Sequence, residues 1–154
     1  MALLQVCTED ESKFDDYQHI FAEIVEAAEY TMNVLDVAMS RAPKFQFDSH
    51  IVIPLVMVGH KCRDPSLRRR AISLMLSHPR REGVWDSMLA GRCAAWAMEV
   101  EEEHLEERKV PGWARIHGVI LERDRQPRRA NFICEQRLGP LAEHTITWRK
   151  AIIW

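Results

Sequence analysis

The spacing of apolar residues changes at Pro111-Gly112, and this change constrains the fold more than any other feature of the chain. Before this point, apolar side chains recur every three or four residues, the spacing that gathers them on one face of an α-helix. After it, apolar and polar residues alternate over 116–121 and 130–135, which is typical of partly buried strands. We therefore expect a mainly α fold, with a helical part over residues 9–110 and a C-terminal β-hairpin over 113–136.

About four helices are expected, and the first of them is long and amphipathic. Thr8-Glu9-Asp10-Glu11 fits a capping box, so this helix should begin near residue 9 and continue to about residue 39. Its apolar stripe consists of Phe14, Tyr17, Phe21, Ile24, Ala28, Thr31, Leu35 and Ala38. Ile20, Ala27 and Val34 widen the stripe, which indicates that the helix packs against more than one neighbour.

Three shorter helices should follow the first one. Residues 50–61 are mostly apolar on all sides, which favours a buried helix with a proline in its first turn; a short strand over 51–53 is the alternative. Asp64-Pro65 places an N-cap residue before a proline, a specific signal for a helix start. Glu82-Gly83 is expected to open the last of the three helices.

The size and composition of the chain favour a single domain over residues 1–154. Of its 154 residues, 47% are apolar, enough to bury one hydrophobic core. The tail, residues 138–154, should either dock on that domain or remain flexible. The longest uncharged run, from Ser49 to His60, is too short to cross a membrane, so no membrane contact is expected.

The cysteines are scattered along the chain and form no Cys-x-x-Cys pair. This spacing favours buried thiols of an intracellular protein over disulfides or zinc ligands. The four residues are Cys7, Cys62, Cys93 and Cys134.

The formal net charge of −2 conceals four blocks of alternating sign. Residues 1–36 carry nine acidic residues and one basic residue, whereas residues 37–95 carry ten basic and four acidic residues. Residues 96–107 contain six glutamates and no basic residue, and residues 108–154 are basic again. A nucleic-acid binder usually presents one dominant basic surface, so pairing of these blocks within the fold is favoured over specific DNA binding.

No catalytic motif emerges from the sequence. Glu101 and His104 have the Glu-x-x-His spacing of di-iron helices, and Asp16 and His19 form an imperfect second pair. This set defines one alternative function, a helical metal-dependent enzyme, although a solvated acidic helix face explains the same residues. Glycine-rich phosphate loops and the Gly-x-Ser-x-Gly nucleophile motif do not occur. We therefore expect a protein that is not an enzyme and that needs no cofactor or metal.

A more informative pattern lies between residues 47 and 87. Its parts are Phe47-Asp48-Ser49, Pro54-Leu55, Lys61-Cys62-Arg63-Asp64-Pro65-Ser66-Leu67-Arg68-Arg69-Arg70-Ala71 and Pro79-Arg80-Arg81-Glu82-Gly83-Val84-Trp85-Asp86-Ser87. This order resembles the C-terminal part of the fungal-specific transcription factor region found in fungal zinc-cluster regulators. The segment Ala114-Arg115-Ile116-His117-Gly118-Val119 resembles the part of that family that follows its long helix. The resemblance covers about residues 14–135.

The resemblance implies a non-enzymatic regulatory or protein-interaction module, nuclear or otherwise cytoplasmic, in a fungus. Members of the family are longer, so the chain would be the C-terminal piece of a larger helical regulatory region. It would fold against a protein partner or against missing helices. The family's DNA-binding module needs six clustered cysteines, which this sequence does not contain, so zinc and specific DNA binding are not expected. A homodimer, or a dimerising scaffold unrelated to transcription, is a further alternative.

The motif residues are expected to form ion pairs and helix caps, and contact with a partner or a ligand carboxylate is the alternative. Asp64-Pro65 should place three arginines over two polar helical turns, while Arg80 and Arg81 can bond carboxylates or the carbonyls at a helix end. The positions that match the family are Lys61, Cys62, Arg63, Asp64, Pro65, Arg68, Arg69, Arg70, Arg80, Arg81, Glu82, Gly83, Trp85 and Asp86.

Overall fold

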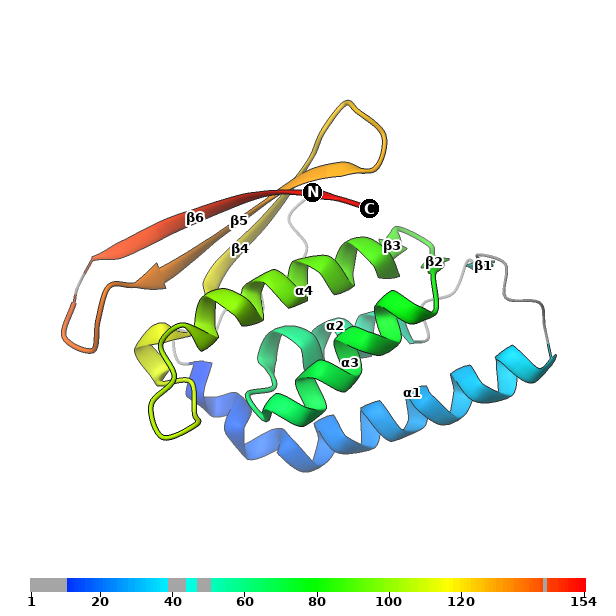
Figure 1. Ribbon diagram of the computed structural model, residues 1–154, viewed down its shortest axis with the longest axis horizontal. Coiled ribbons are helices and arrows are strands. Elements are labelled where there is room, and N and C mark those ends of the chain that lie inside the picture. Colours follow the sequence, from blue (N-terminus) through cyan, green and yellow to red (C-terminus); the bar gives the residue numbers. More distant parts are fainter. Residues whose placement is uncertain (1–10, 39–43, 47–50, 143) are drawn as a thin grey trace. The chain divides into compact units, whose positions relative to one another are not determined.

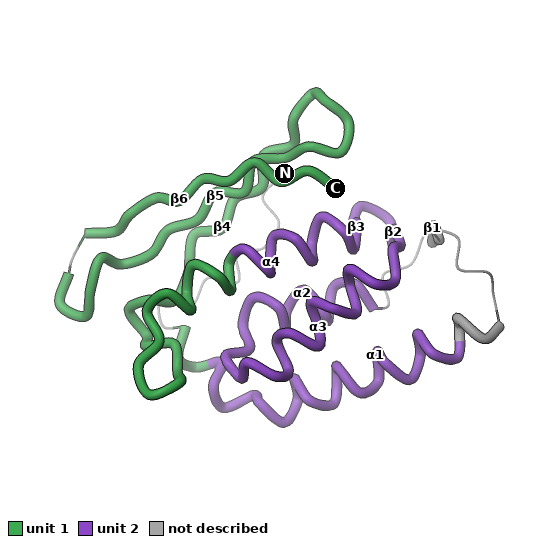
Figure 2. Tube along the Cα trace, in the orientation of Figure 1, with its two compact units in different colours: residues 1–13, 97–154 green, residues 14–96 purple. Residues whose placement is uncertain are grey.

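The computed structural model of the chain describes residues 11–38, 44–46, 51–142 and 144–154 (Figure 1). The chain divides into two compact units, residues 14–96 and residues 1–13 with 97–154, and each is described by itself (Figure 2). The predicted Thr8 cap, Cys7 and the segment Phe47-Asp48-Ser49 lie outside the described residues. None of the described helices is long and apolar enough to span a membrane.

The helices of the chain lie mainly in the unit formed by residues 14–96. They are α1 (Gln18–Ala38), α2 (Val52–Lys61), α3 (Pro65–Ser77) and α4 (Ser87–Glu102), of which α4 continues past residue 96. A 3-10 segment, η1 (Glu11–Tyr17), precedes α1 where the sequence predicts continuous α-helix. Helix α3 begins as predicted, because the Asp64 side chain accepts a hydrogen bond from the Leu67 amide at 2.8 Å and Pro65 follows it.

Helices α1, α2 and α3 contact one another around the core of this unit. Over residues 18–34, the part of α1 whose side chains the structure describes, the buried residues are Phe21, Val25, Ala28 and Met32. Only Phe21 and Ala28 belong to the predicted stripe, and Tyr17, at 49% exposure, faces away from the core. Two adjacent rows of this helix have apolar residues at helical spacing, and periodicity alone does not decide which row is buried.

Glycines let the helices of this unit approach closely. A Cβ atom built at Gly59 of α2 would lie 2.9 Å from the Cβ of Ala94 in α4. A Cβ atom at Gly91 of α4 would lie 2.9 Å from Cδ2 of Leu76 in α3. Only glycine fits such contacts without a shift of the neighbouring residue, so α2, α3 and α4 form one closely packed group.

A small sheet lies beside these helices, with strands β1 (Lys44–Gln46), β2 (Arg80–Glu82) and β3 (Trp85–Asp86) in that order. Strand β1 is parallel to β2, and β2 is antiparallel to β3. The sequence predicts that Glu82-Gly83 opens a helix, and this is wrong. Gly83 has a φ of 56°, which turns the chain into β3.

Helix α4 begins four residues later than predicted because Asp86, not Glu82, provides its first cap. The Asp86 carboxylate accepts hydrogen bonds from the amides of Met88 and Leu89 at 3.0 and 3.1 Å. These are the amides of the first helical turn, which otherwise have no partner within the helix.

The second unit contains an antiparallel sheet of three strands, β4 (His117–Arg123), β5 (Arg129–Arg137) and β6 (Thr145–Ile153), in that order. The predicted hairpin corresponds to β4 and β5, with a register shift near Gly118, where φ is 59°. The tail, for which the sequence allowed either docking or flexibility, contains strand β6. This strand pairs with β5 from Arg137 to Arg129. The buried face of β5 includes Ala130, Phe132, Cys134 and Gln136.

The prediction of a mainly α fold with a simple hairpin is therefore wrong, and the fold is mixed α/β. Two causes account for the error. Strand β6 buries little of its own surface, and Lys150 interrupts its apolar row, so its alternation is weak. Strands β1 to β3 have only two or three residues each, too few to produce a periodic pattern.

Candidate functional site

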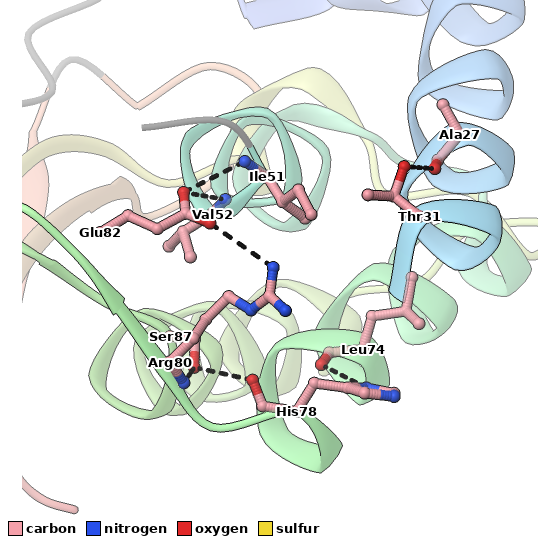
Figure 3. A network of polar contacts seen from close by, with 9 residues as sticks. All are labelled: Ala27, Thr31, Ile51, Val52, Leu74, His78, Arg80, Glu82 and Ser87. Carbon is pink, nitrogen blue, oxygen red and sulfur yellow. Dashed lines mark hydrogen bonds and ion pairs between the residues drawn. The ribbon is translucent and has the colours of Figure 1, made fainter. Parts of the chain in front are cut away.

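The motif residues gather at the two ends of helix α2, within the unit of residues 14–96. At the N-terminal end, the Glu82 carboxylate accepts hydrogen bonds from the amides of Ile51 and Val52 at 3.1 and 3.0 Å (Figure 3). These amides belong to the start of the helix, where no partner within the helix exists and where the helix dipole favours a negative charge. Glu82 therefore caps a helix that begins 30 residues earlier in the chain.

Arg80 provides the positive charge beside Glu82. Its Nη1 lies 3.6 Å from Glu82 Oε1, and the two side chains are 3% and 0% exposed. The Arg80 amide donates to the hydroxyl of Ser87 at 3.0 Å, and that hydroxyl lies 3.5 Å from the carbonyl oxygen of His78 (Figure 3). A buried charge is costly unless it is paired, so this ion pair and its hydrogen bonds connect the end of α3, strand β2 and the start of α2.

Two arginines occupy the C-terminal end of α2. Arg68 Nε donates to the carbonyl of Gly59 at 2.8 Å, and Arg63 Nη1 donates to the carbonyl of His60 at 2.6 Å. Both side chains are buried. Carbonyls in the last turn of a helix lack partners within it, and a cation suits the negative end of the helix dipole. The motif therefore supplies a carboxylate to one end of α2 and guanidinium groups to the other.

Two further basic residues of the motif contact η1 and α1. Lys61 Nζ lies 5.1 Å from the centre of the Phe14 ring, a cation–π distance. Arg70 makes two hydrogen bonds with the Glu29 carboxylate, at 3.0 and 2.7 Å. The hydrogen bonds from Arg70 lower the pKa of Glu29, and the same contact raises the pKa of Arg70. An acidic block and a basic block of the sequence thus meet within this unit.

The remaining motif residues lie nearer the surface. Arg81 is exposed and its Nε donates to the carbonyl of Gly83 at 3.2 Å, across the turn between β2 and β3. Arg69 is also exposed, and its Nη1 donates to the carbonyl of Pro65 at 3.2 Å. Trp85 is half-buried in β3. The two hydrogen bonds of Arg81 and Arg69 are local.

The basic residues of the motif do not form one exposed surface. Lys61, Arg63, Arg68 and Arg80 are between 1% and 9% exposed. Their charged groups are directed to helix carbonyls, to an aromatic ring or to Glu82. Phosphate binding needs accessible guanidinium or ammonium groups, so the clustering of these residues in the sequence reflects packing of the helices.

The cysteines of the described residues are buried and carry free thiols. Burial raises the pKa values of Cys93 and Cys134 to about 12, and it also raises the pKa of Cys62. The Cys62 thiol lies 3.3 Å from the side-chain oxygen of Gln18, to which it donates. A thiol with a raised pKa is a poor nucleophile, so these residues have no features of a catalytic cysteine.

The four residues of the alternative metal site either contact other groups of the protein or are exposed. Glu101 is 1% exposed and its Oε1 accepts a hydrogen bond from the amide of Ile116 at 2.8 Å. The ring of His104 packs against Trp113, with 4.9 Å between the ring centres. Asp16 and His19 are exposed. Within the part of the chain that the structure describes, no group of three or more His, Cys, Asp or Glu residues is arranged to hold a metal ion.

Sequence reasoning missed three buried polar residues that organise the structure. Ser87 is the first of them. In the second unit, Gln136 Nε2 donates to the carbonyl of Ala114 at 2.6 Å, and its oxygen accepts from Trp148 at 3.0 Å. Arg115 Nη1 donates to the carbonyl of Glu11 at 2.9 Å. Gln136 lies in strand β5, where a polar residue in a buried row was the available signal. Ser87 and Arg115 stand within the segments that resemble the regulator family, but no local pattern indicates their partners.

Comparison with known proteins gives one informative result. Over 64 residues, 42% of its length, the chain is 41% identical to the aspercryptin biosynthesis cluster-specific transcription regulator atnN of Emericella nidulans. The match covers 10% of that regulator, so the chain spans a small part of this relative. No family model and no solved structure matches the chain. The chain is thus similar, over part of its length, to a fungal transcription regulator.

Proposed function

We propose that the chain is a non-enzymatic regulatory module of a fungal transcription regulator, corresponding to the C-terminal part of its regulatory region. The observation that carries the proposal is the partial similarity to a transcription regulator, which agrees with the resemblance of residues 14–135 to that family. The module acts in the nucleus by contact with a protein partner or with other helices of a larger regulator.

The structure supports a structural role for the motif residues. Arg63, Arg68, Arg80 and Glu82 are buried and directed to the ends of α2 or to each other. A buried group that caps a helix is not available to bind substrate, phosphate or a ligand carboxylate. The motif therefore stabilises the module, and recognition of a partner uses other surfaces.

A tethering experiment tests this function. The full chain is fused to an unrelated sequence-specific DNA-binding domain and expressed in a fungal host with a reporter gene. We expect reporter transcription to change severalfold relative to the DNA-binding domain alone. The matched control is the fusion carrying Glu82→Ala, which removes the cap of α2 and should abolish the effect. An intact, folded fusion that leaves transcription unchanged would refute the proposal.

A second measurement separates regulation through a partner from direct DNA contact. The purified chain is mixed with random-sequence duplex at two salt concentrations. Binding at low salt that weakens steeply with added salt would show a phosphate-binding surface and contradict the proposal. We expect no such binding, because Lys61, Arg63, Arg68 and Arg80, four of the seven basic residues of the motif, are buried.

A further inference from the structure

Helix α1 has a second apolar row that the unit of residues 14–96 leaves open. The core side uses Phe21, Val25, Ala28 and Met32. The second row, which we name the α1 stripe, consists of Tyr17 at the end of η1 and of Ile20, Ile24, Ala27, Thr31 and Val34 in α1. Tyr17, Ile20 and Val34 are 49%, 40% and 49% exposed, Ala27 is exposed, and Ile24 and Thr31 are half-buried.

The α1 stripe has the spacing of a helix-packing surface. Its residues follow one another in steps of three and four, the pattern of the a and d positions in a coiled coil. From Ile20 to Val34 it extends about 21 Å along α1 at 1.5 Å per residue, long enough for about four turns of a partner helix. The Thr31 hydroxyl donates to the Ala27 carbonyl at 2.7 Å, so its polar group is satisfied within the helix (Figure 3).

The charges beside the stripe are acidic. Asp16 and Glu23 are exposed at the positions next to the stripe on the side away from the core row, and Glu26 is exposed further round the helix. Helix α1 contains no lysine or arginine, and its Glu29 is paired with Arg70. A second copy of α1 would place acidic residues against acidic residues, which opposes self-association along this stripe. Acidic flanks also repel nucleic acid and anionic lipid surfaces.

We propose that the α1 stripe is a docking surface for a basic amphipathic helix of a partner protein, with an apolar a/d row and lysine or arginine at the flanking positions. The proposal rests on the function proposed above and names the surface and the chemistry of the partner. The apolar rows of the two helices supply the contact area, and the pairing of basic with acidic flanks determines which helices are accepted.

Two synthetic peptides test the proposal. Both are about three heptads long with leucine at positions a and d; one has lysine and the other glutamate at positions e and g. Binding of each labelled peptide to the full chain is measured by fluorescence anisotropy. We expect the lysine peptide to bind at least about tenfold more tightly than the glutamate peptide at low salt, with a smaller difference at high salt.

Two substitutions locate the binding surface. Ile20→Glu should weaken binding of the lysine peptide about tenfold, because it places a charge within the apolar row. The matched control is Val84→Glu, which changes an apolar side chain of similar exposure, 51%, outside α1 and should leave binding unchanged. Replacing Asp16 and Glu23 together by lysine should reverse the preference toward the glutamate peptide. Circular dichroism of each variant is the control that shows whether its helices are retained.

Several results would overturn the proposal. They are equal binding of the two peptides, no binding of either, binding unaffected by Ile20→Glu, or a dimer of the free chain that Ile20→Glu dissociates. The last result would assign the stripe to a second copy of the chain. The tethering experiment keeps the two proposals apart. If the wild-type fusion alters transcription and the Ile20→Glu fusion does so equally, the docking surface is wrong while the proposed function stands.

Discussion

Removal of the Glu82 carboxylate is the most direct test of how the motif stabilises the helical unit. In Glu82→Ala, the amides of Ile51 and Val52 lose their acceptor and Arg80 loses its buried counter-ion. Breaking a buried ion pair by removing one partner typically costs about 3–5 kcal/mol. This range already includes much of the loss of the two charge-assisted hydrogen bonds, so we expect a decrease of about 4 kcal/mol in the free energy of unfolding.

A loss of this size is a large fraction of the total stability of a small protein, which is typically about 5–15 kcal/mol. The assay is urea unfolding at neutral pH, followed by circular dichroism for the helices and by tryptophan fluorescence for the tertiary structure. Glu82→Gln should be milder, about 3 kcal/mol, because its side-chain carbonyl still accepts a hydrogen bond although Arg80 loses its counter-ion. Glu23→Ala, at an exposed position of α1, is the control and should change stability by less than about 0.5 kcal/mol.

The double variant makes the test sharper. In Arg80→Met with Glu82→Gln, no buried charge remains, and we expect the protein to be more stable than Arg80→Met alone. The reasoning would be refuted if Glu82→Ala cost less than about 1 kcal/mol, or if the two substitutions were simply additive. Either result would show that the carboxylate does not act as the buried cap and counter-ion that the distances indicate.

Three other predictions follow from the packing and the ionisation of particular groups. Gly59→Ala should lower the free energy of unfolding by about 1–3 kcal/mol, measured by urea unfolding, because its Cβ would overlap a neighbouring helix; unchanged stability would contradict the close approach. Cys93 and Cys134 should resist alkylation by iodoacetamide at pH 8 until urea unfolds the protein, because burial raises their pKa values to about 12. The pKa of Glu29 is lowered in the folded state, so its pairing with Arg70 stabilises the protein above the pKa of the unfolded carboxyl, and this small contribution is lost as the pH falls through the folded value. The destabilisation caused by Arg70→Met should therefore be larger at pH 7 than at pH 3, and should shrink with added salt.

The helices were predictable where their signals are local. Asp64-Pro65 predicts the start of α3, because a cap and the proline that follows it act within one helical turn. The hairpin of β4 and β5 follows from alternation of apolar residues within each strand. Strand β6 was missed because its stability depends on pairing with β5, a partner outside its own sequence.

The contacts of the candidate site were not predictable in detail because they join residues that are distant in the chain. Glu82 caps a helix that begins at Val52, and no local pattern connects the two positions. The same limit applies to Arg68, whose partner is the carbonyl of Gly59 on the preceding helix. Residue type alone indicates that such groups need partners, whereas the identity of the partner depends on how the helices pack.

The burial of the motif affects how a similarity to a regulator should be interpreted. Residues that cap helix ends are required by the fold, so any chain that folds in this way needs them whatever partner it binds. A shared motif of this kind therefore indicates a shared structure more directly than a shared target. What distinguishes one such module from another must lie on exposed surfaces, and among the described residues the apolar row of α1 with its acidic border is one such surface of the helical unit.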